Sequence, residues 1–132
     1  MFFQFHGWAV VHSASRLPSA VELESGYENE DKKAIEAIQR YLDEHYTFPF
    51  NLNWSNGLKI LNTSGCSNHY RASPMQLFQF IRDTAAGAYG LLYVLDEENE
   101  EGWENTFQAW ILRDGSLTRA EDRFLSPIKL QL

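Results

Sequence analysis

Residues 87–115 read GAYGLLYVLDEENEEGWENTFQAWILRDG, and the rest of the chain is organised around them. Residues 89–95 are apolar without polar alternation, a pattern typical of a strand covered on both faces near the middle of a sheet. Residues 106–113 are again largely apolar and predict a returning strand. It closes on Asp114 and Gly115, a pair that favours a two-residue hairpin turn. The segment therefore predicts two antiparallel strands joined by a polar loop and followed by a tight turn.

The loop between these strands, residues 96–104, is named the acidic loop here. It holds six of the chain's eighteen acidic residues, more than the rim of a core requires. They are Asp96, Glu97, Glu98, Glu100, Glu101 and Glu104. Clustered like charge steers an oppositely charged partner, so we interpret the loop as a surface for a basic macromolecule. The alternative is that the acids only keep the protein soluble.

The composition indicates one soluble globular domain over residues 1–132. The chain is 44% hydrophobic with a formal net charge of −7, which disfavours nucleic acid as a partner because binding a polyanion relies on Lys and Arg. No stretch approaches the roughly 20 apolar residues of a membrane-spanning helix, and residues 1–8 lack the features of a secretory signal. The single cysteine, Cys66, excludes an internal disulfide framework. We expect a cytoplasmic protein without metal or cofactor.

Two segments have helical patterns. The first begins at Asn29, a residue type that caps helices. Its apolar positions have helical spacing and are Ile35, Ile38, Tyr41, Leu42 and His45. The second begins with Ser73 as its cap, Pro74 at the first helical position and Gln76 where a capping box needs it, and Gly87 is expected to end it. Its buried stripe consists of Leu77, Phe78, Ile81 and Ala85.

Three further strands are predicted before the second helix. Residues 2–11 are apolar enough for a strand, with His6 and Trp8 on the side opposite Phe3 and Phe5. A second strand over residues 48–55 alternates apolar and polar positions and begins after its proline. Asn56 and Gly57 form a strong hairpin turn pair, and the returning strand covers residues 58–61.

The other segments complete the expected fold. We expect loops over residues 13–27 and from residue 62 to the second helix. Residues 117–122 are ambiguous, whereas residues 124–132 predict a final strand, placed at an edge by Pro127. The order of elements predicts an α+β domain, a mainly antiparallel β-sheet with two α-helices packed against it.

Few residues are candidates for a catalytic nucleophile or a metal ligand. Cys66 and His69 lie three apart in a polar stretch, and a small hydrolase that uses them is the enzymatic alternative. Neither a zinc ligand set nor an orienting group accompanies them, so we expect Cys66 to be a partly buried structural cysteine and His6 a core histidine. Asn68, His69 and Arg71 form either a recognition loop or a network that ties the loop to the following helix.

The acidic loop leaves one further alternative. Crowded carboxylates attract calcium, which would make the chain an ion-dependent binding module. The spacing in residues 96–102 does not match the known calcium loop, and strands rather than helices flank it. Paired carboxylates for sugar hydrolysis require opposed placement in a cleft, which one loop does not supply. We therefore expect a binding protein rather than an enzyme.

Short motifs follow one another along nearly the whole chain. The most specific are YGLLY at residues 89–93 and FLSP at residues 124–127. The others are His6-Gly7-Trp8, Asn56-Gly57, Gly65 with Asn68-His69, Gly87-Ala88, Asp96-Glu97, Asn105 with Phe107, Arg113 with Gly115, and Asp122. In this order the set resembles the immunity protein 7 family. These antidote proteins are encoded beside toxins in bacterial polymorphic toxin and contact-dependent inhibition systems.

The resemblance implies a cytoplasmic, non-catalytic antidote whose partner is the C-terminal domain of a cognate toxin. We expect a basic, nuclease-like toxin domain, held at nanomolar affinity or about −12 kcal/mol, whose active or binding surface is occluded. The residues expected to contact it are Glu97, Glu98, Glu100, Glu101, Trp103 and Glu104, with an exposed Trp103 as the anchor. The apolar terminal strand allows either a monomer or a weak dimer.

Overall fold

The computed structural model describes residues 2–13 and 27–127, with side chains in the second range from residue 31. Its elements are β1 (Phe3–Val10), α2 (Tyr27–His45), β2 (Phe50–Ser55), β3 (Leu58–Ser67), α3 (Ser73–Thr84), β4 (Tyr89–Asp96), β5 (Gln108–Arg113) and β6 (Ser116–Glu121). The strands of this part form one antiparallel sheet in the order β2-β3-β1-β4-β5-β6. The predicted α+β class is confirmed.

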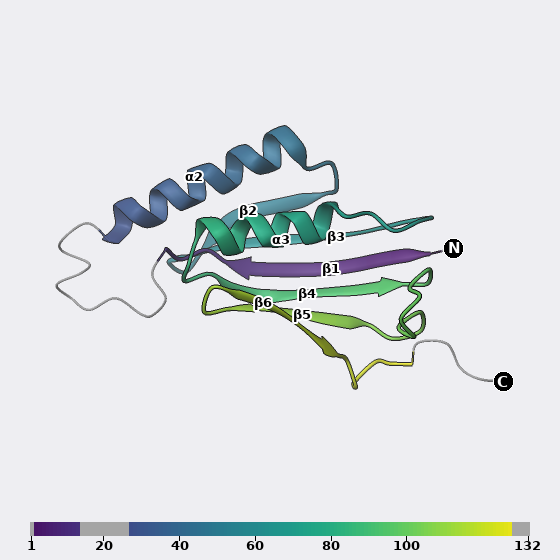
Figure 1. Cartoon of the computed structure of the whole chain (residues 1–132). Coiled ribbons are helices and arrows are strands. Elements are labelled where there is room, and N and C mark those ends of the chain that lie inside the picture. The colour runs from purple at the N-terminus through teal and green to yellow at the C-terminus, as the bar shows by residue number, and fades with distance from the viewer. Residues whose placement is uncertain (1, 14–26, 128–132) are drawn as a thin grey trace.

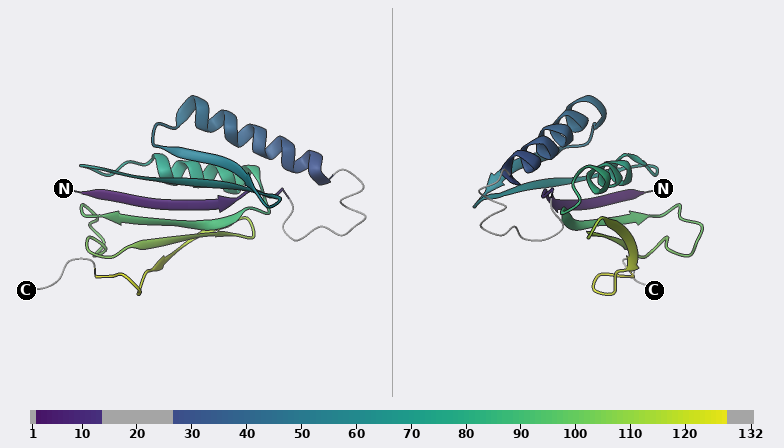
Figure 2. Two further views of the ribbon diagram at one scale, coloured as in Figure 1. Left: turned by 180° about the vertical axis from the view of Figure 1, so that it is seen from behind. Right: turned by 60° about the vertical axis from the view of Figure 1, so that its left-hand side comes forward.

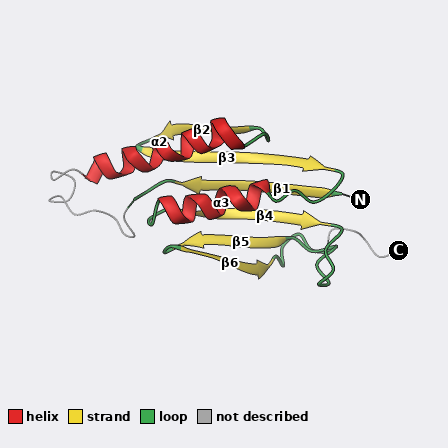
Figure 3. Ribbon diagram, turned by 45° about the horizontal axis from the view of Figure 1, so that its top comes forward, coloured by secondary structure: helices red, strands yellow, loops and turns green. Residues whose placement is uncertain are grey.

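The helices lie on the same face of the sheet (Figure 1, Figure 2). α2 runs over β2 and β3 (Figure 3). α3 runs over β1 and β4 and also contacts β5 and β6. The core between the two layers includes Phe3, Phe5, Leu61, Leu92, Ile38, Leu42, Leu77, Phe78 and Ile81. Among the described residues, no helix covers the opposite face of the sheet, which is called the open face here.

The central strand β4 lies in the middle of the sheet as predicted, but the expectation that both its faces are covered is wrong. Leu92 and Val94 face the core. Leu91 lies on the open face and is only half-buried. It lies opposite Trp8 of β1 and Ile111 of β5. These large neighbours shield it in place of a second layer, so the apolar run does not need one.

β3 is longer than predicted. The expected strand stopped at residue 61, whereas β3 runs to Ser67 and pairs along the whole of β1, with Phe3 opposite Ser67 and Val10 opposite Ile60. Beyond residue 61, its side chains on the open face are small or polar and exposed: Asn62, Ser64 and Cys66. Polar, exposed positions resemble a loop in sequence. Only the pairing with β1, which is distant along the chain, shows that they belong to the sheet.

Both helices differ from prediction at their starts. α2 begins at Tyr27, so Asn29 lies inside the helix rather than capping it. Its buried positions are Ala34, Ile38 and Leu42, while His45, expected in the stripe, is exposed. In α3 the cap is Ala72, without a side-chain hydrogen bond. Ser73 is the first helical residue, and its buried hydroxyl has no hydrogen-bond partner among the described residues. The expected capping box is therefore absent.

α3 has the predicted buried face but ends earlier than predicted. Leu77, Phe78, Ile81 and Ala85 are buried, as the helical spacing predicts. The helix ends at Thr84, before the predicted stop at Gly87. The backbone N–H of Gly87 donates to the carbonyl oxygen of His12 at 3.0 Å, which ties the chain to the end of β1 as it turns into β4.

The two predicted hairpin turns are confirmed. Asn56 and Gly57 have φ values of 48° and 83°, and Asp114 and Gly115 have 51° and 71°. Positive φ at both central residues matches the right-handed twist of the paired strands. β2 begins after Pro49, as expected, although Trp54 near its end is 63% exposed.

The predicted C-terminal strand over residues 124–132 is wrong for residues 124–127, the part that the structure describes. The ambiguous segment forms β6 at the sheet edge, and residues 122–127 form no strand. Phe124 is 92% exposed. The buried Asp122 carboxylate accepts the backbone N–H groups of Phe124 and Leu125, at 3.2 and 3.0 Å, so the chain turns here. Residues 128–132 and 14–26 of the predicted loop lie outside the described residues.

Candidate functional site

The sheet register determines where the acidic loop lies. Phe3 is opposite both Ser67 of β3 and Asp96 of β4. The start of β1, the end of β3 and the end of β4 therefore meet at one end of the sheet (Figure 1). Both the acidic loop and the residues between β3 and α3 leave the sheet at this end, so their side chains come within reach of each other.

The acidic loop is shaped by its own side chains. Asp96 is buried, and its Oδ1 accepts the backbone N–H of Glu98 at 3.0 Å. Asn99 Oδ1 accepts two backbone N–H groups, those of Glu101 at 2.8 Å and Trp103 at 3.2 Å. Asp and Asn commonly fold short loops this way. The loop thus has a defined conformation in which most of its carboxylates point outward.

Two of the predicted contact residues are held by other side chains at the surface. Glu98 Oε1 lies 2.9 Å from Nδ1 of His69, and Glu101 Oε2 lies 3.2 Å from Nη2 of Arg119. The hydrogen bond from His69 is the main reason that the pKa of Glu98 lies below its usual value. The sequence did not indicate Arg119 as a partner of the loop. Arg119 lies on β6, 18 residues after Glu101, and comes close to the loop only because β6 pairs with β5.

The remaining predicted carboxylates differ in exposure. Glu100 and Glu104 are exposed and form no ion pair with any residue that the structure describes. Glu97 is half-buried, and its backbone N–H donates to the carbonyl oxygen of Phe2. The loop therefore presents two carboxylates without an ion pair in the described part of the chain, and two that are held by the side chains of His69 and Arg119.

Trp103 is not the exposed anchor that the sequence predicted. It is half-buried, and the guanidinium of Arg119 lies 4.7 Å from the centre of its ring. The same guanidinium lies 5.8 Å from the ring of Trp110 on β5. Arg119 thus lies between two tryptophans while it pairs with Glu101, and Trp103 is part of the support of the loop.

Cys66 and His69, the residues of the enzymatic alternative, have no hydrogen bond to each other in the described part of the chain. Cys66 is exposed on the open face, not partly buried as expected. His69 directs its Nδ1 to Glu98, and the guanidinium of Arg71 lies 5.5 Å from the ring of Phe48. The polar loop before α3 therefore contacts the acidic loop through His69 and the ring of Phe48 through Arg71. These contacts differ from the predicted network with the start of the helix.

Two other histidines, His6 and His12, lie close to polar side chains elsewhere in the structure. His6, expected in the core, is exposed on the open face, where its Nε2 lies 2.7 Å from the amide of Gln4. His12 Nδ1 lies 3.4 Å from Asp31 on α2. Among the side chains of residues 2–13 and 31–127, no group of three or more His, Cys, Asp or Glu is placed to hold a metal ion.

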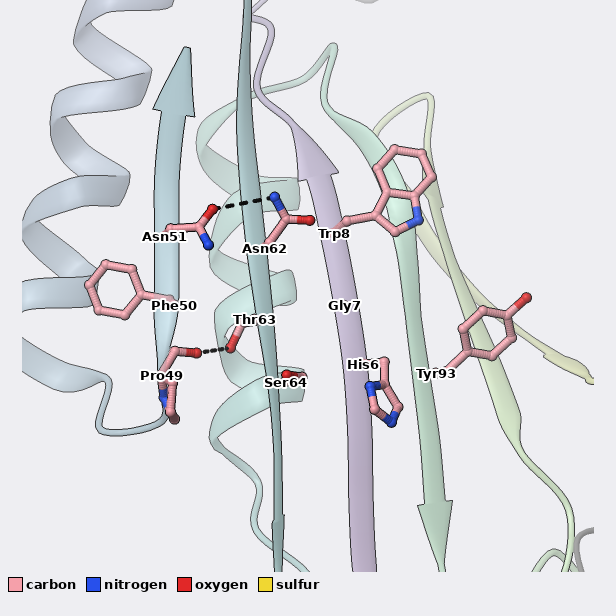
Figure 4. A pocket seen from close by; sticks show the side chains of 10 residues that line it. All are labelled: His6, Gly7, Trp8, Pro49, Phe50, Asn51, Asn62, Thr63, Ser64 and Tyr93. Carbon is pink, nitrogen blue, oxygen red and sulfur yellow. Dashed lines mark hydrogen bonds between the residues drawn. The ribbon is translucent and has the colours of Figure 1, made fainter. Parts of the chain in front are cut away.

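A shallow recess marks the open face (Figure 4). It has a volume of about 420 Å³ and is lined by residues of β1, β2, β3 and β4, which include the three aromatic residues Trp8, Phe50 and Tyr93. Its labelled side chains include His6, Trp8, Asn51, Asn62, Ser64 and Tyr93. Asn62 donates to Asn51 at 3.4 Å. No acid or Lys or Arg lines it, so this part of the surface is unlike the acidic loop.

Comparison with known proteins identifies the family of the chain. Neither described helix is long and apolar enough to cross a membrane. Nothing among curated proteins or solved structures matches the chain significantly. One family model does match, immunity protein 7, and it covers residues 1–132, including the acidic loop and every element of the sheet. The ordered motifs had indicated the same family. The chain therefore belongs to the immunity protein 7 family.

Proposed function

We propose that this protein neutralises a cognate bacterial toxin by binding its C-terminal domain, a basic and nuclease-like domain, and covering its active or binding surface. The observation that carries the proposal is the acidic loop, an ordered loop with exposed carboxylates at one end of the sheet. Family membership supports an antidote role, and the loop supplies the chemistry for a basic partner.

Charge supports this choice of partner. The chain has 18 acidic residues against 11 Lys and Arg, and the acidic loop concentrates a third of the acids. Complementary charge raises association rates by roughly ten- to a thousand-fold and disfavours wrong partners. An antidote must bind its toxin before the toxin acts, so fast association is an advantage here.

The order within the loop supports tight binding. Ordering a flexible loop on association weakens binding. Here Asn99 and Asp96 already fix the backbone of the loop. We expect an interface near 1,600 Å² in total and a Kd in the nanomolar range or below, about −12 kcal/mol.

The proposed mechanism requires no catalytic step by the antidote. Occlusion alone prevents substrate from reaching the toxin, so neither Cys66 nor His69 has a catalytic role in this account. We propose that the protein acts in the cytoplasm, within a polymorphic toxin or contact-dependent inhibition system, as a monomer or weak dimer.

Co-expression tests the proposal directly. The toxin domain encoded immediately upstream is induced in bacteria with or without this protein, and survival is counted. A purified, catalytically inactive form of the domain is titrated by calorimetry in parallel. We expect survival and nanomolar one-to-one binding. Loss of viability despite folded, expressed protein, together with no heat of binding, would contradict the proposal.

A further inference from the structure

A second feature lies beside the acidic loop on the helix-bearing face of the sheet. It is a slot of about 250 Å³ between the N-terminal end of α3 and strand β5. Its lining residues are Phe3, Tyr70, Arg71, Pro74, Met75, Val94, Gln108 and Trp110. Pro74 and Met75 of α3 lie on one side of this space, and Gln108 and Trp110 of β5 lie on the other.

The slot is apolar at its base and has aromatic walls. Phe3 and Val94 are buried and form the floor. Tyr70, which is 48% exposed, packs its ring against Phe3 with centroids 5.3 Å apart. On the other side Trp110 donates its Nε1–H to Gln108 at 3.1 Å. Partly exposed Tyr and Trp beside a buried floor are typical of the residues that dominate binding energy at interfaces.

The acidic loop contacts residues that line the slot or lie next to it. Glu98 accepts from the ring of His69 and from the backbone N–H of Tyr70, so its carboxylate lies next to the residue that forms one wall. On the β5 side, Arg119 joins Trp110 to Trp103 and Glu101. The lining itself contains no acid and includes Arg71. The slot is therefore a mainly apolar depression with carboxylates of the acidic loop close to two of its sides, similar to the apolar centre and polar rim of protein interfaces.

The size and charge of the slot limit what it can hold. It is smaller than the roughly 300–1,000 Å³ of typical small-molecule pockets, and its lining is mainly apolar. A single apolar side chain of a protein fits this chemistry better than a metabolite does. Glu100 and Glu104 of the neighbouring acidic loop are exposed and form no ion pair with a described residue, so they favour Lys or Arg in the segment that carries that side chain.

We infer that the slot receives one large apolar side chain from the toxin, carried on a basic segment whose Lys or Arg residues meet the acidic loop. The inference rests on the proposed function and adds the anchor that Trp103 does not supply. The slot should then determine how long the complex lasts, while the acidic loop determines how fast it forms. Buried anchors act mainly on dissociation and surface charge acts mainly on association.

Filling the slot tests the inference. Met75→Trp places a large ring in it, and Tyr70→Ala removes one wall from a half-exposed position. Gln76→Trp is the matched control, because it adds the same ring at the next, exposed residue of α3. The probe is the inactive toxin domain encoded upstream, measured by surface plasmon resonance. We expect at least about tenfold faster dissociation for the first two variants, association rates within twofold of wild type, and a control that behaves as wild type.

The outcomes separate this inference from the proposed function. If the wild-type protein does not bind the toxin domain, the proposed function fails and the inference fails with it. If wild type binds but both slot variants dissociate at the wild-type rate, only the slot is overturned. A change in self-association by light scattering, with toxin binding intact, would also overturn it by assigning the slot to a second copy. Should Met75→Trp unfold, as judged by circular dichroism, Tyr70→Ala decides.

Discussion

His69 Nδ1 and Glu98 Oε1 lie 2.9 Å apart and join the loop before α3 to the acidic loop, across 29 positions of sequence. A carboxylate can only accept a hydrogen bond, so the ring nitrogen carries the proton. The pair fixes one carboxylate at the edge of the slot. It also holds together the two segments that leave the same end of the sheet.

The first prediction concerns the titration of Glu98. Because its carboxylate accepts a hydrogen bond from His69, the pKa of Glu98 lies below its usual value. We expect carbon-detected NMR to show Glu98 titrating below the ordinary Glu value of about 4.3, and His69→Ala to move the midpoint back toward it. Since the pKa is lowered in the folded state, the pair stabilises the fold above that ordinary value and loses this effect as pH falls. An unchanged midpoint in His69→Ala would contradict the assignment.

The second prediction concerns the closeness of the central strands. A Cβ added at Gly90 would lie 2.0 Å from the carbonyl oxygen of Trp8 and 2.7 Å from Cα of Ala9. These are backbone atoms, so the clash can be relieved only by separating β1 from β4. We expect Gly90→Ala to reduce the free energy of unfolding by at least about 3 kcal/mol, or to prevent folding.

Gly7→Ala is the matched comparison on the neighbouring strand. Its added Cβ would meet side chains, the Phe78 ring at 3.0 Å and Leu92 at 3.1 Å, and side chains can move. We expect a smaller loss, about 1 to 3 kcal/mol. Urea denaturation measures both variants. Equal losses would show that strand separation is not the governing cost.

The third prediction concerns a buried tyrosine. Tyr46 is 7% exposed, and its hydroxyl lies 2.7 Å from Thr63 Oγ1, which donates to the carbonyl oxygen of Pro49 at 2.8 Å. Burial raises the pKa of Tyr46 from 10.0 to about 12, although the Thr63 hydrogen bond opposes this shift. The folded state therefore keeps the Tyr46 proton when the unfolded state has lost it. Stability is full below pH 10 and falls as pH rises toward 12.

Tyr46→Phe tests this directly. We expect a loss of about 1 kcal/mol at neutral pH from the missing hydrogen bond, and a weaker decline in stability above pH 10 than in wild type. Absorbance at 295 nm should show one fewer late-ionising tyrosine. A variant whose alkaline decline equals that of wild type would mean that another group is responsible.

The fourth prediction concerns Cys66. Its side chain is exposed on the open face and makes no described contact with His69. We expect Cys66→Ser to change stability by less than about 0.5 kcal/mol and to leave toxin protection intact. The thiol of the folded wild type should react fully with a maleimide. Loss of protection in a folded Cys66→Ser variant would revive the enzymatic alternative.

Local patterns in the sequence predicted most of the fold. The helical spacing of Leu77, Phe78 and Ile81 and the two positive-φ turns depend on neighbouring residues, so they could be read directly. The length of β3 could not, because its exposed Asn62 and Ser64 resemble a loop and its partner β1 lies far along the chain. The start of α3 also departs from the expected pattern, since Ser73 is helical rather than the cap.

The candidate site was only partly predictable for the same reason. The acidic loop is contiguous in sequence and was found. Its side-chain partners His69 and Arg119 come from the segment before α3 and from β6, and only folding brings them to the loop. The arrangement of Arg119 between Trp103 and Trp110 has no sequence pattern. That is why Trp103 was expected to be exposed and the slot beside it was not foreseen.

The central claim is that the acidic loop recruits a basic toxin domain, and association kinetics test it most directly. Glu100→Lys with Glu104→Lys reverses the two uncommitted carboxylates. Glu36→Lys with Glu44→Lys makes the same change in net charge at exposed positions of α2. Both double variants and wild type are mixed with the inactive toxin domain by stopped flow at low and high salt. We predict at least about tenfold slower association for the loop variant at low salt, a much smaller change for the α2 variant, and convergence at high salt. Equal association rates for the two double variants would contradict the claim and place the contact surface elsewhere.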